Sequence, residues 1–229
     1  MEIRVLSDAA AVAAEAAKVI AAEGRGAVAA RGRFSMAVSG GQTPWLMLRA
    51  LAREDLPWNK VYVAQVDERV APAGSKERNL THLRDSLLAH APLPPTNVCA
   101  MPVDSPDLEA AANQYALNLR EIAGAPPVLD LVHLGLGPDG HTASLVPGDP
   151  VLDVTDADVA LTQPYQERRR MTLTFPALNR ARRILWVVTG AEKAGMLLCL
   201  REGDVTIPAG FISRDQALVL ADRAAAERL

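Results

Sequence analysis

Strand-length apolar runs alternate with helical segments along the whole chain. The runs expected to form strands are 3–6, 34–38, 61–66, 97–101, 128–134, 159–161, 172–175, 184–189 and 217–220. The segments expected to form helices are 9–22, 44–52, 80–91, one from a cap at 104–106 to 123, one beginning near 142, 176–182, one beginning at 190, and 221–229. Such alternation is typical of parallel strands covered by helices. We therefore predict an α/β fold, a doubly wound, mostly parallel sheet with helices on both faces in a Rossmann-like, three-layer arrangement.

The length of the chain and its apolar content fit one domain. The 229 residues are 49% hydrophobic, which is enough for a large core. No linker rich in Gly, Ser or Pro divides the chain, and the sequence has no internal repeat. We expect a single domain over residues 1–229, with residues around 145–170 projecting as a small subregion.

Charge and aromatic content argue against several classes of partner. The net charge is −3 with a pI near 5.8, which gives no reason to expect nucleic acid or an anionic membrane. An aromatic content of 4% also argues against base-stacking platforms. No apolar run is long enough to span a membrane, and the N-terminus lacks a secretory signal. We expect a cytoplasmic protein and, because no apolar face is left over, a monomer.

The cysteines and histidines show no metal-ligand spacing, so we expect no metal site. Cys99 and Cys199 are expected to be buried, reduced thiols. His82 and His90 are interpreted as surface or hydrogen-bonded residues, and His133, inside the run 128–134, as a core histidine. His141 is the one histidine in a different setting.

A glycine-rich loop follows the apolar run 128–134 and contains both Asp139 and His141. In open α/β sheets, ligands bind beyond the carboxyl ends of the strands. The segment 135–140 also matches the dinucleotide fingerprint G-x-G-x-x-G. Pro147 leaves no room for the crossover helix that this fingerprint needs, and Asp139 places a negative charge where the pyrophosphate would lie. We therefore reject a dinucleotide-dependent oxidoreductase.

A second glycine loop, Ser39-Gly40-Gly41-Gln42-Thr43-Pro44, lies between the expected strand 34–38 and a helix. Its two glycines allow backbone N–H groups to approach an anion, and the helix N-terminus favours negative charge. The loop lacks the lysine of a nucleotide P-loop. It therefore favours a single phosphate on a small molecule, or else is a plain turn between a strand and a helix.

Charged residues lie next to three other expected strands, after two of them and before the third. Asp67-Glu68-Arg69 follows the run 61–66, Arg168 to Arg170 precede the run 172–175, and Lys193 lies shortly after the run 184–189. Runs of charge are usually solvated, but Asp67 to Arg69 and Lys193 lie past the carboxyl ends of strands, where the two glycine loops are expected, and one of the three arginines can turn inward to a phosphate. They are therefore candidates for contact with an anionic ligand.

Five of these motifs, in this order, resemble those of the 6-phosphogluconolactonases, in the superfamily that they share with glucosamine-6-phosphate isomerase. The motifs are 39–44, 67–69, 135–144, 170–174 and 189–193. The resemblance covers nearly the whole chain. It implies hydrolysis of 6-phospho-D-glucono-1,5-lactone to 6-phosphogluconate, in the oxidative pentose phosphate pathway. It also implies that no cofactor is needed.

The resemblance assigns roles to individual residues. Gly40, Gly41 and Thr43 are expected to bind the phosphate, and Arg69, Arg170 and Lys193 to contact the phosphate and the sugar. His141 is expected to be the general base, and Asp139 to orient its imidazole or bind sugar hydroxyls. A histidine side chain suits this task because it titrates near neutral pH.

Two roles stay open at this point. The oxyanion of the tetrahedral intermediate needs a partner, which is either Arg69 or a backbone N–H of the loop 137–140. We favour the phosphate as the ligand of Arg69, and a role for Asp67 and Glu68 in holding Arg69 in place.

Two other functions are compatible with a phosphate-binding α/β domain. The isomerase branch carries an acidic residue five positions after the motif histidine, where this chain has Val146. It also carries a residue other than arginine directly after its Asp-Glu pair, where this chain has Arg69. A sugar-phosphate sensor of a transcriptional regulator normally carries a DNA-binding segment, which we do not find before the first expected strand. Both comparisons favour the lactonase.

Overall fold

The computed structural model describes residues 1–229, and a seven-stranded sheet forms its centre. Its strands lie in the order β1-β10-β9-β6-β2-β3-β5, and all neighbouring pairs are parallel. The strands are β1 (Glu2–Leu6), β2 (Phe34–Val38), β3 (Val61–Gln65), β5 (Val98–Cys99), β6 (Leu131–Leu134), β9 (Ile184–Val188) and β10 (Ala217–Asp222). The predicted parallel sheet is confirmed.

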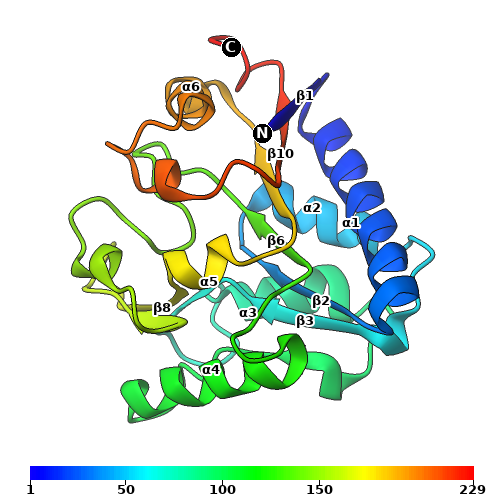
Figure 1. Ribbon diagram of the computed structural model, residues 1–229, viewed down its shortest axis with the longest axis vertical. Coiled ribbons are helices and arrows are strands. Elements are labelled where there is room, and N and C mark those ends of the chain that lie inside the picture. The colour runs from blue at the N-terminus through cyan, green and yellow to red at the C-terminus, as the bar shows by residue number, and fades with distance from the viewer.

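Helices cover both faces of this sheet (Figure 1). They are α1 (Ala9–Arg31), α2 (Gln42–Leu51), α3 (Asn79–Leu83), which continues as a π-helix (Arg84–Leu88), α4 (Leu108–Ala123), α5 (Phe175–Asn179) and α6 (Ala194–Glu202). Short 3₁₀-helices lie at Trp58–Lys60, Pro95–Asn97, Pro150–Asp153, Ala191–Lys193 and Pro208–Phe211. None of the helices combines the length and the apolar character that crossing a membrane requires.

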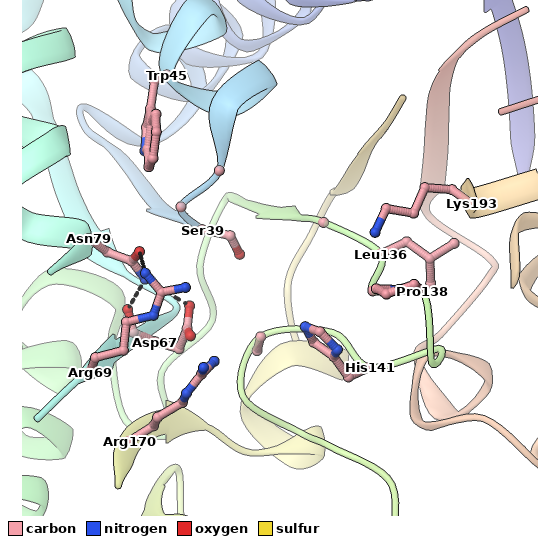
Figure 2. A pocket seen from close by; sticks show the side chains of 15 residues that line it. Ser39, Trp45, Asp67, Arg69, Asn79, Leu136, Pro138, His141, Arg170 and Lys193 are labelled. Carbon is pink, nitrogen blue, oxygen red and sulfur yellow. Dashed lines mark hydrogen bonds between the residues drawn. The ribbon is translucent and has the colours of Figure 1, made fainter. Parts of the chain in front are cut away.

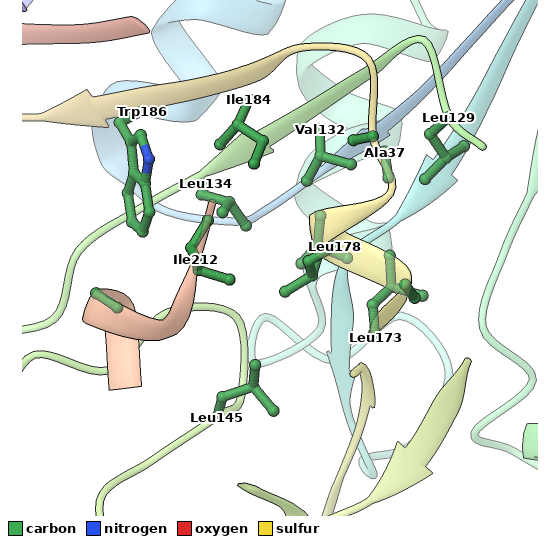
Figure 3. Packing of buried hydrophobic residues seen from close by; sticks show 14 of the residues in the cluster. Ala37, Leu129, Val132, Leu134, Leu145, Leu173, Leu178, Ile184, Trp186 and Ile212 are labelled. Carbon is green, nitrogen blue, oxygen red and sulfur yellow. The ribbon is translucent and has the colours of Figure 1, made fainter. Parts of the chain in front are cut away.

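The period-two alternation of each strand divides the core into two layers. In β9, Ile184 and Trp186 pack with α4, α5 and α6, whereas Leu185 and Val187 pack with α1, α2 and α3. Figure 3 shows the first of these layers, in which Trp186 and Ile184 lie near residues of β6 and α5. Because both faces are covered, β9 is apolar and buried throughout, as the sequence indicated.

Helix α1 extends well beyond its expected end at residue 22. It begins at Asp8, whose carboxylate accepts the N–H of Ala11 (2.9 Å), and ends at Gly32, which has a φ of +76°. Two glycines within it had suggested an earlier end, since each costs about 1 kcal/mol relative to Ala. A Cβ on Gly24 would lie 2.7 Å from Leu56 Cδ2 and 3.1 Å from Phe34 Cδ1. The missing side chain therefore allows α1 to pack closely on the core.

Two expected helices are absent. The segment after His141 is a turn in which Thr142 pairs with Leu145, and the prediction of a helix there was wrong. Ala143 has a φ of +52°, and the hydroxyl of Thr142 donates to Gly135 O (2.9 Å). The chain therefore reverses its direction in a turn and does not form a helix. Beyond Asp222 the chain also forms turns, and the prediction of a terminal helix there was wrong.

A second, antiparallel sheet of three strands lies beside the first. Its order is β4-β8-β7, formed by β4 (Asp67–Arg69), β8 (Arg170–Leu173) and β7 (Val159–Leu161). The register of β4 and β8 pairs Arg69 with Arg170. Segments that are far apart in the sequence therefore present two guanidinium groups at one place.

The order of the main sheet creates a switch point between β2 and β6. The chain leaves β2 toward β3 on one side of the pair and leaves β6 toward β9 on the other side. The loops after β2 and β6 therefore emerge next to each other at the carboxyl edge, where ligands bind in open α/β sheets.

Candidate active site

A pocket of about 240 Å³ lies at this carboxyl edge, bounded by both glycine loops and by the small sheet (Figure 2). Six of the eight residues expected from the sequence to have catalytic or binding roles line it: Gly40, Gly41, Arg69, His141, Arg170 and Lys193. The other lining residues are Ser39, Trp45, Asp67, Asn79, Gly135, Leu136, Gly137, Pro138 and Ala143. Thr43 and Asp139 do not line the pocket.

Asp139 lies behind His141 and fixes its ring. The Nδ1 atom of His141 is 2.5 Å from Asp139 Oδ1, and the same oxygen accepts the backbone N–H of His141 (3.2 Å). Burial is the largest influence on the pKa of Asp139 and raises it, but the hydrogen bond and charge of His141 outweigh burial, and the pKa is lowered. An ionised carboxylate only accepts, so Nδ1 carries a proton, and in the neutral form of the ring Nε2 then has a free lone pair.

The glycines of this loop make the pairing possible. Gly140 has a φ of +79°, and its N–H donates to Gly137 O (3.1 Å). The N–H of Gly137 donates in turn to His141 O (2.8 Å). The loop therefore closes on itself, and these two N–H groups are already engaged within it.

The other glycine loop is anchored from below by the core histidine. The fully buried His133 accepts the N–H of Ser39 at Nδ1 (3.2 Å), and its carbonyl accepts the Ser39 hydroxyl (3.1 Å). Helix α2 then begins at Gly41, which has a φ of +129°, without a side-chain cap. The interpretation of His133 as a core residue is confirmed, and the uncapped N-terminus of α2 faces the pocket with its positive dipole end.

Thr43 does not share the pocket with Gly40 and Gly41, which precede it in the loop. Its hydroxyl is 2.8 Å from the hydroxyl of Thr189, which follows β9, and its side chain is buried. The contact joins the loops after β2 and β9. A role of Thr43 in phosphate binding stays a prediction.

Two arginines lie on the side of the pocket formed by the small sheet. Arg69 donates from Nη1 to Glu77 O (2.8 Å) and to Asn79 Oδ1 (3.4 Å). Arg170 is only 4% exposed, and its Nε has no partner. Burial lowers the pKa of Arg170, with Asp67 acting against it. An arginine nevertheless stays charged, so the site holds a desolvated cation.

Two neighbouring carboxylates support these arginines in different ways. Asp67 lines the pocket and accepts from the Ser144 hydroxyl (2.6 Å), and burial raises its pKa. Glu68 is fully buried and accepts the backbone N–H groups of Arg69, Asn79 and Leu80, each at 2.8 Å. Glu68 therefore holds both the strand that carries Arg69 and the start of α3, as expected for a supporting residue.

Lys193 approaches the pocket from the opposite side (Figure 2). It is the last residue of a 3₁₀-helix, Ala191–Lys193, that follows β9. The three cationic side chains therefore surround the cavity, with His141 between them. Such a cavity suits a small anion that also carries a reactive carbonyl.

Three residues near the site had no distinct signal in the sequence. Asn79 touches Gly40 so closely that a Cβ on that glycine would lie 2.1 Å from Asn79 Oδ1. Trp45 lines the pocket from α2 and stacks on His82, with ring centroids 3.8 Å apart. Tyr165 donates from its hydroxyl to Asp139 Oδ2 (3.3 Å). Each lies in a segment of ordinary loop or helix composition, so only the fold reveals them.

The other histidines and the two cysteines lie away from the pocket lining. His82 is hydrogen-bonded to Lys76 O (2.8 Å) and His90 is exposed, which confirms both interpretations. Cys99 and Cys199 are free thiols that are only half-buried, so the expectation of full burial was wrong. Cys99 lies on β5, an edge strand of the main sheet, which is why it is not fully covered.

Comparison with known proteins agrees with this architecture. A 6-phosphogluconolactonase of Synechocystis sp. is 37% identical over 201 residues, which are 84% of this chain and 83% of that protein. The structure of 6-phosphogluconolactonase from Thermotoga maritima has a TM-score of 0.85 at 30% identity, covering 96% of this chain and 98% of that one. A monomeric glucosamine-6-phosphate deaminase has a TM-score of 0.86 at 19% identity over 100% of both chains, a likeness of fold alone.

The family described as glucosamine-6-phosphate isomerases/6-phosphogluconolactonase matches residues 7–220. This range includes both glycine loops, β4, β8 and the segment that carries Lys193. From the match and from the relatives of similar length, we conclude that the chain belongs to the glucosamine-6-phosphate isomerase/6-phosphogluconolactonase family.

Proposed function

We propose that the protein hydrolyses 6-phospho-D-glucono-1,5-lactone to 6-phospho-D-gluconate, the lactone-opening reaction of the oxidative pentose phosphate pathway. The observation that carries the proposal is the His141–Asp139 pair, 2.5 Å apart, beside a pocket lined by Arg69, Arg170 and Lys193. The lactone offers a carbonyl to a general base, and its phosphate offers negative charge to the cations. Membership of the family and the named relatives support the same reaction.

In the proposed mechanism, His141 acts as the general base through Nε2. It takes a proton from a water molecule whose oxygen forms a bond to the lactone carbonyl carbon. Asp139, bound to Nδ1–H, stabilises the imidazolium that results. The tetrahedral intermediate then collapses, the bond from this carbon to the ring oxygen breaks, and the imidazolium returns the proton to that oxygen.

The phosphate is proposed to bind at the end of the pocket formed by Gly40, Gly41 and Arg69. These groups are contiguous, because Asn79 contacts Gly40 and accepts a hydrogen bond from Arg69. The N-terminus of α2 adds a favourable dipole. Thr43, which follows the two glycines, belongs to the same proposed phosphate end. Lys193 contributes positive charge from the opposite side.

The carbonyl is proposed to lie near His141 with Arg170 as the partner of its oxyanion. The N–H groups of Gly137 and Gly140 are engaged within their own loop, which argues against them as donors. Arg170 lies with its Cζ 4.8 Å from the centre of the Tyr165 ring, and Tyr165 contacts Asp139. Arg170 is therefore the cation that is linked to the pair, through Tyr165.

The test is an assay of purified protein with freshly generated 6-phosphogluconolactone, following acid release against the spontaneous background. His141→Asn should reduce kcat by about two to four orders of magnitude with little change in KM. His90→Asn, at an exposed position, is the matched control and should be indistinguishable from wild type. Wild-type kcat in His141→Asn would exclude His141 as the base.

Glucosamine-6-phosphate, run in parallel, tests the isomerase branch. The position five residues after His141 is Val146, which is buried and apolar, so no carboxylate is available there for proton transfer between carbons. We therefore expect no turnover of the amino sugar. Turnover of the amino sugar without lactone opening would refute the proposed function.

A further inference from the structure

Tyr165 lies at the tip of the hairpin that joins β7 to β8. Its N–H donates to Arg168 O (2.9 Å), and the N–H of Arg168 returns to Tyr165 O (3.3 Å). The two residues between them, Gln166 and Glu167, have φ values of +51° and +64°. This is the backbone of a tight two-residue hairpin turn, which residues other than Gly, Asn and Asp rarely form. The turn fixes the direction in which the Tyr165 side chain leaves the hairpin.

The Tyr165 side chain contacts both halves of the chemical machinery. Its hydroxyl donates to Asp139 Oδ2 (3.3 Å), while the other oxygen of the same carboxylate holds His141. Its ring meets the His141 ring edge-on, with centroids 5.8 Å apart. The Arg170 guanidinium lies over the ring, with its Cζ 4.8 Å from the centroid. Tyr165 therefore contacts Asp139, His141 and Arg170 with a single side chain.

We propose that Tyr165 is a positioning residue that acts on the reaction through Asp139 and Arg170. With both oxygens of Asp139 engaged, rotation of the carboxylate is restrained, which favours the form of His141 with a proton on Nδ1. The ring supports Arg170, whose other side-chain partners are Gln166 Oε1 at 3.1 Å and Ser144 Oγ at 3.5 Å. The proposal rests on the proposed function, because the reaction at His141 is what Tyr165 assists.

The two contacts can be separated by substitution. Tyr165→Phe removes only the hydroxyl, and Tyr165→Leu also removes the ring under Arg170. An O–H···O separation of 3.3 Å is long, so the hydroxyl should contribute modestly: we expect Tyr165→Phe to lower kcat by about three- to tenfold with KM unchanged. Tyr165→Leu should lower kcat further. Tyr62→Phe, at a tyrosine on β3 away from the pocket, is the matched control and should leave both constants unchanged.

A double-mutant cycle distinguishes positioning through Asp139 from a general structural effect. If the hydroxyl acts through the carboxylate, adding Tyr165→Phe to the Asp139→Asn variant should not lower kcat any further. An equal loss in both backgrounds, or no loss in the wild-type background, would overturn the proposal.

A measurement without substrate separates this proposal from the proposed function. Protein labelled with ¹⁵N-histidine should show a downfield Nδ1–H signal for His141, produced by its short hydrogen bond to Asp139. Tyr165→Phe should shift or broaden this signal, and Tyr62→Phe should not. An unchanged signal in Tyr165→Phe would refute the positioning role even if the lactone proved not to be the substrate, and a changed signal would support it.

Discussion

Gly137 leaves the space that the His141 ring occupies. A Cβ added to Gly137 would lie 2.1 Å from His141 Nδ1, 2.4 Å from its Cε1 and 2.7 Å from Asp139 Oδ1. None of these separations is compatible with a carbon atom at that place. The pairing of His141 with Asp139 therefore depends on a residue without a side chain two positions before Asp139.

Gly137→Ala should reduce catalysis while leaving substrate binding largely intact. The backbone of Gly137 is not left-handed, so alanine fits its conformation, and the new methyl group must displace the ring and the carboxylate instead. Misplacement of a catalytic group by about 1 Å can cost about 100-fold in rate. We expect kcat for the phosphorylated lactone to fall by about 10- to 100-fold, with KM within about threefold of wild type.

Gly26→Ala is the matched control for this variant. Gly26 lies on α1 and does not line the pocket, and no side chain lies within 4 Å of a Cβ built on it. Its kinetic constants should stay close to those of wild type. If Gly137→Ala were as active as wild type with an unchanged melting temperature, the His141 position described here would not be the one used in catalysis.

The position of Arg69 predicts that its charge serves the phosphate end of the substrate. Arg69 contacts Asn79, which packs on Gly40, whereas Arg170 contacts the tyrosine beside His141. Arg69→Met should therefore raise KM for 6-phosphogluconolactone by about 10- to 100-fold, the range for loss of a hydrogen bond to a charged group. Hydrolysis of unphosphorylated glucono-1,5-lactone should be almost unaffected.

Arg168→Met controls for the loss of a nearby positive charge. Arg168 is exposed and pairs with Glu77 (2.8 Å), but it does not line the pocket. Exposed pairs of this kind contribute about 0–1 kcal/mol, so this variant should behave like wild type. An equal loss of kcat on both lactones in Arg69→Met would instead assign Arg69 to the oxyanion.

The sheet and its helices were predictable because burial leaves a clear pattern in the sequence. Strands covered on both faces become continuous apolar runs, and these located β2, β3, β6 and β9 closely. Local signals failed where tertiary contacts decided the outcome. Gly24 suggested an end to α1, but its close packing on Phe34 and Leu56 keeps the helix continuous.

The candidate site was predictable where function requires an unusual local sequence. Glycine loops after strands drew attention to Gly40, Gly41 and the turn before His141, because ligands bind beyond the carboxyl ends of the strands in open α/β sheets. Tyr165 and Asn79 come from segments whose local composition is that of any polar loop. Tyr165 and Asp139 are 26 residues apart in the sequence. The hairpin that carries Tyr165 is placed next to Asp139 by the pairing of β8 with β4 and β7.

His133 should make the folded state sensitive to acid. It is fully buried, its Nε2 has no partner, and burial lowers its pKa to about 3. In the unfolded chain a histidine takes up a proton near its usual pKa of about 6.5. The unfolded state therefore binds more protons than the folded state between these values, so stability falls as the pH falls below about 6.5. The expected slope is about 1.4 kcal/mol per pH unit.

Urea unfolding at several pH values between 7 and 4 measures this slope. His133→Asn offers an acceptor to Ser39 N–H but does not titrate, so its free energy of unfolding should start lower at pH 7 and then fall less steeply. Other groups also change the slope; the raised pKa of Asp67, for example, stabilises the fold in acid. These groups are common to both proteins, so they cancel in the difference between the two free energies of unfolding. His90→Asn, at an exposed position, should retain the wild-type slope. If the free energies of unfolding of His133→Asn and wild type fell in parallel with pH, His133 would take up its proton as readily in the folded protein as in the unfolded chain. Its Nδ1 could not then be the acceptor that anchors the β2 loop through Ser39 N–H.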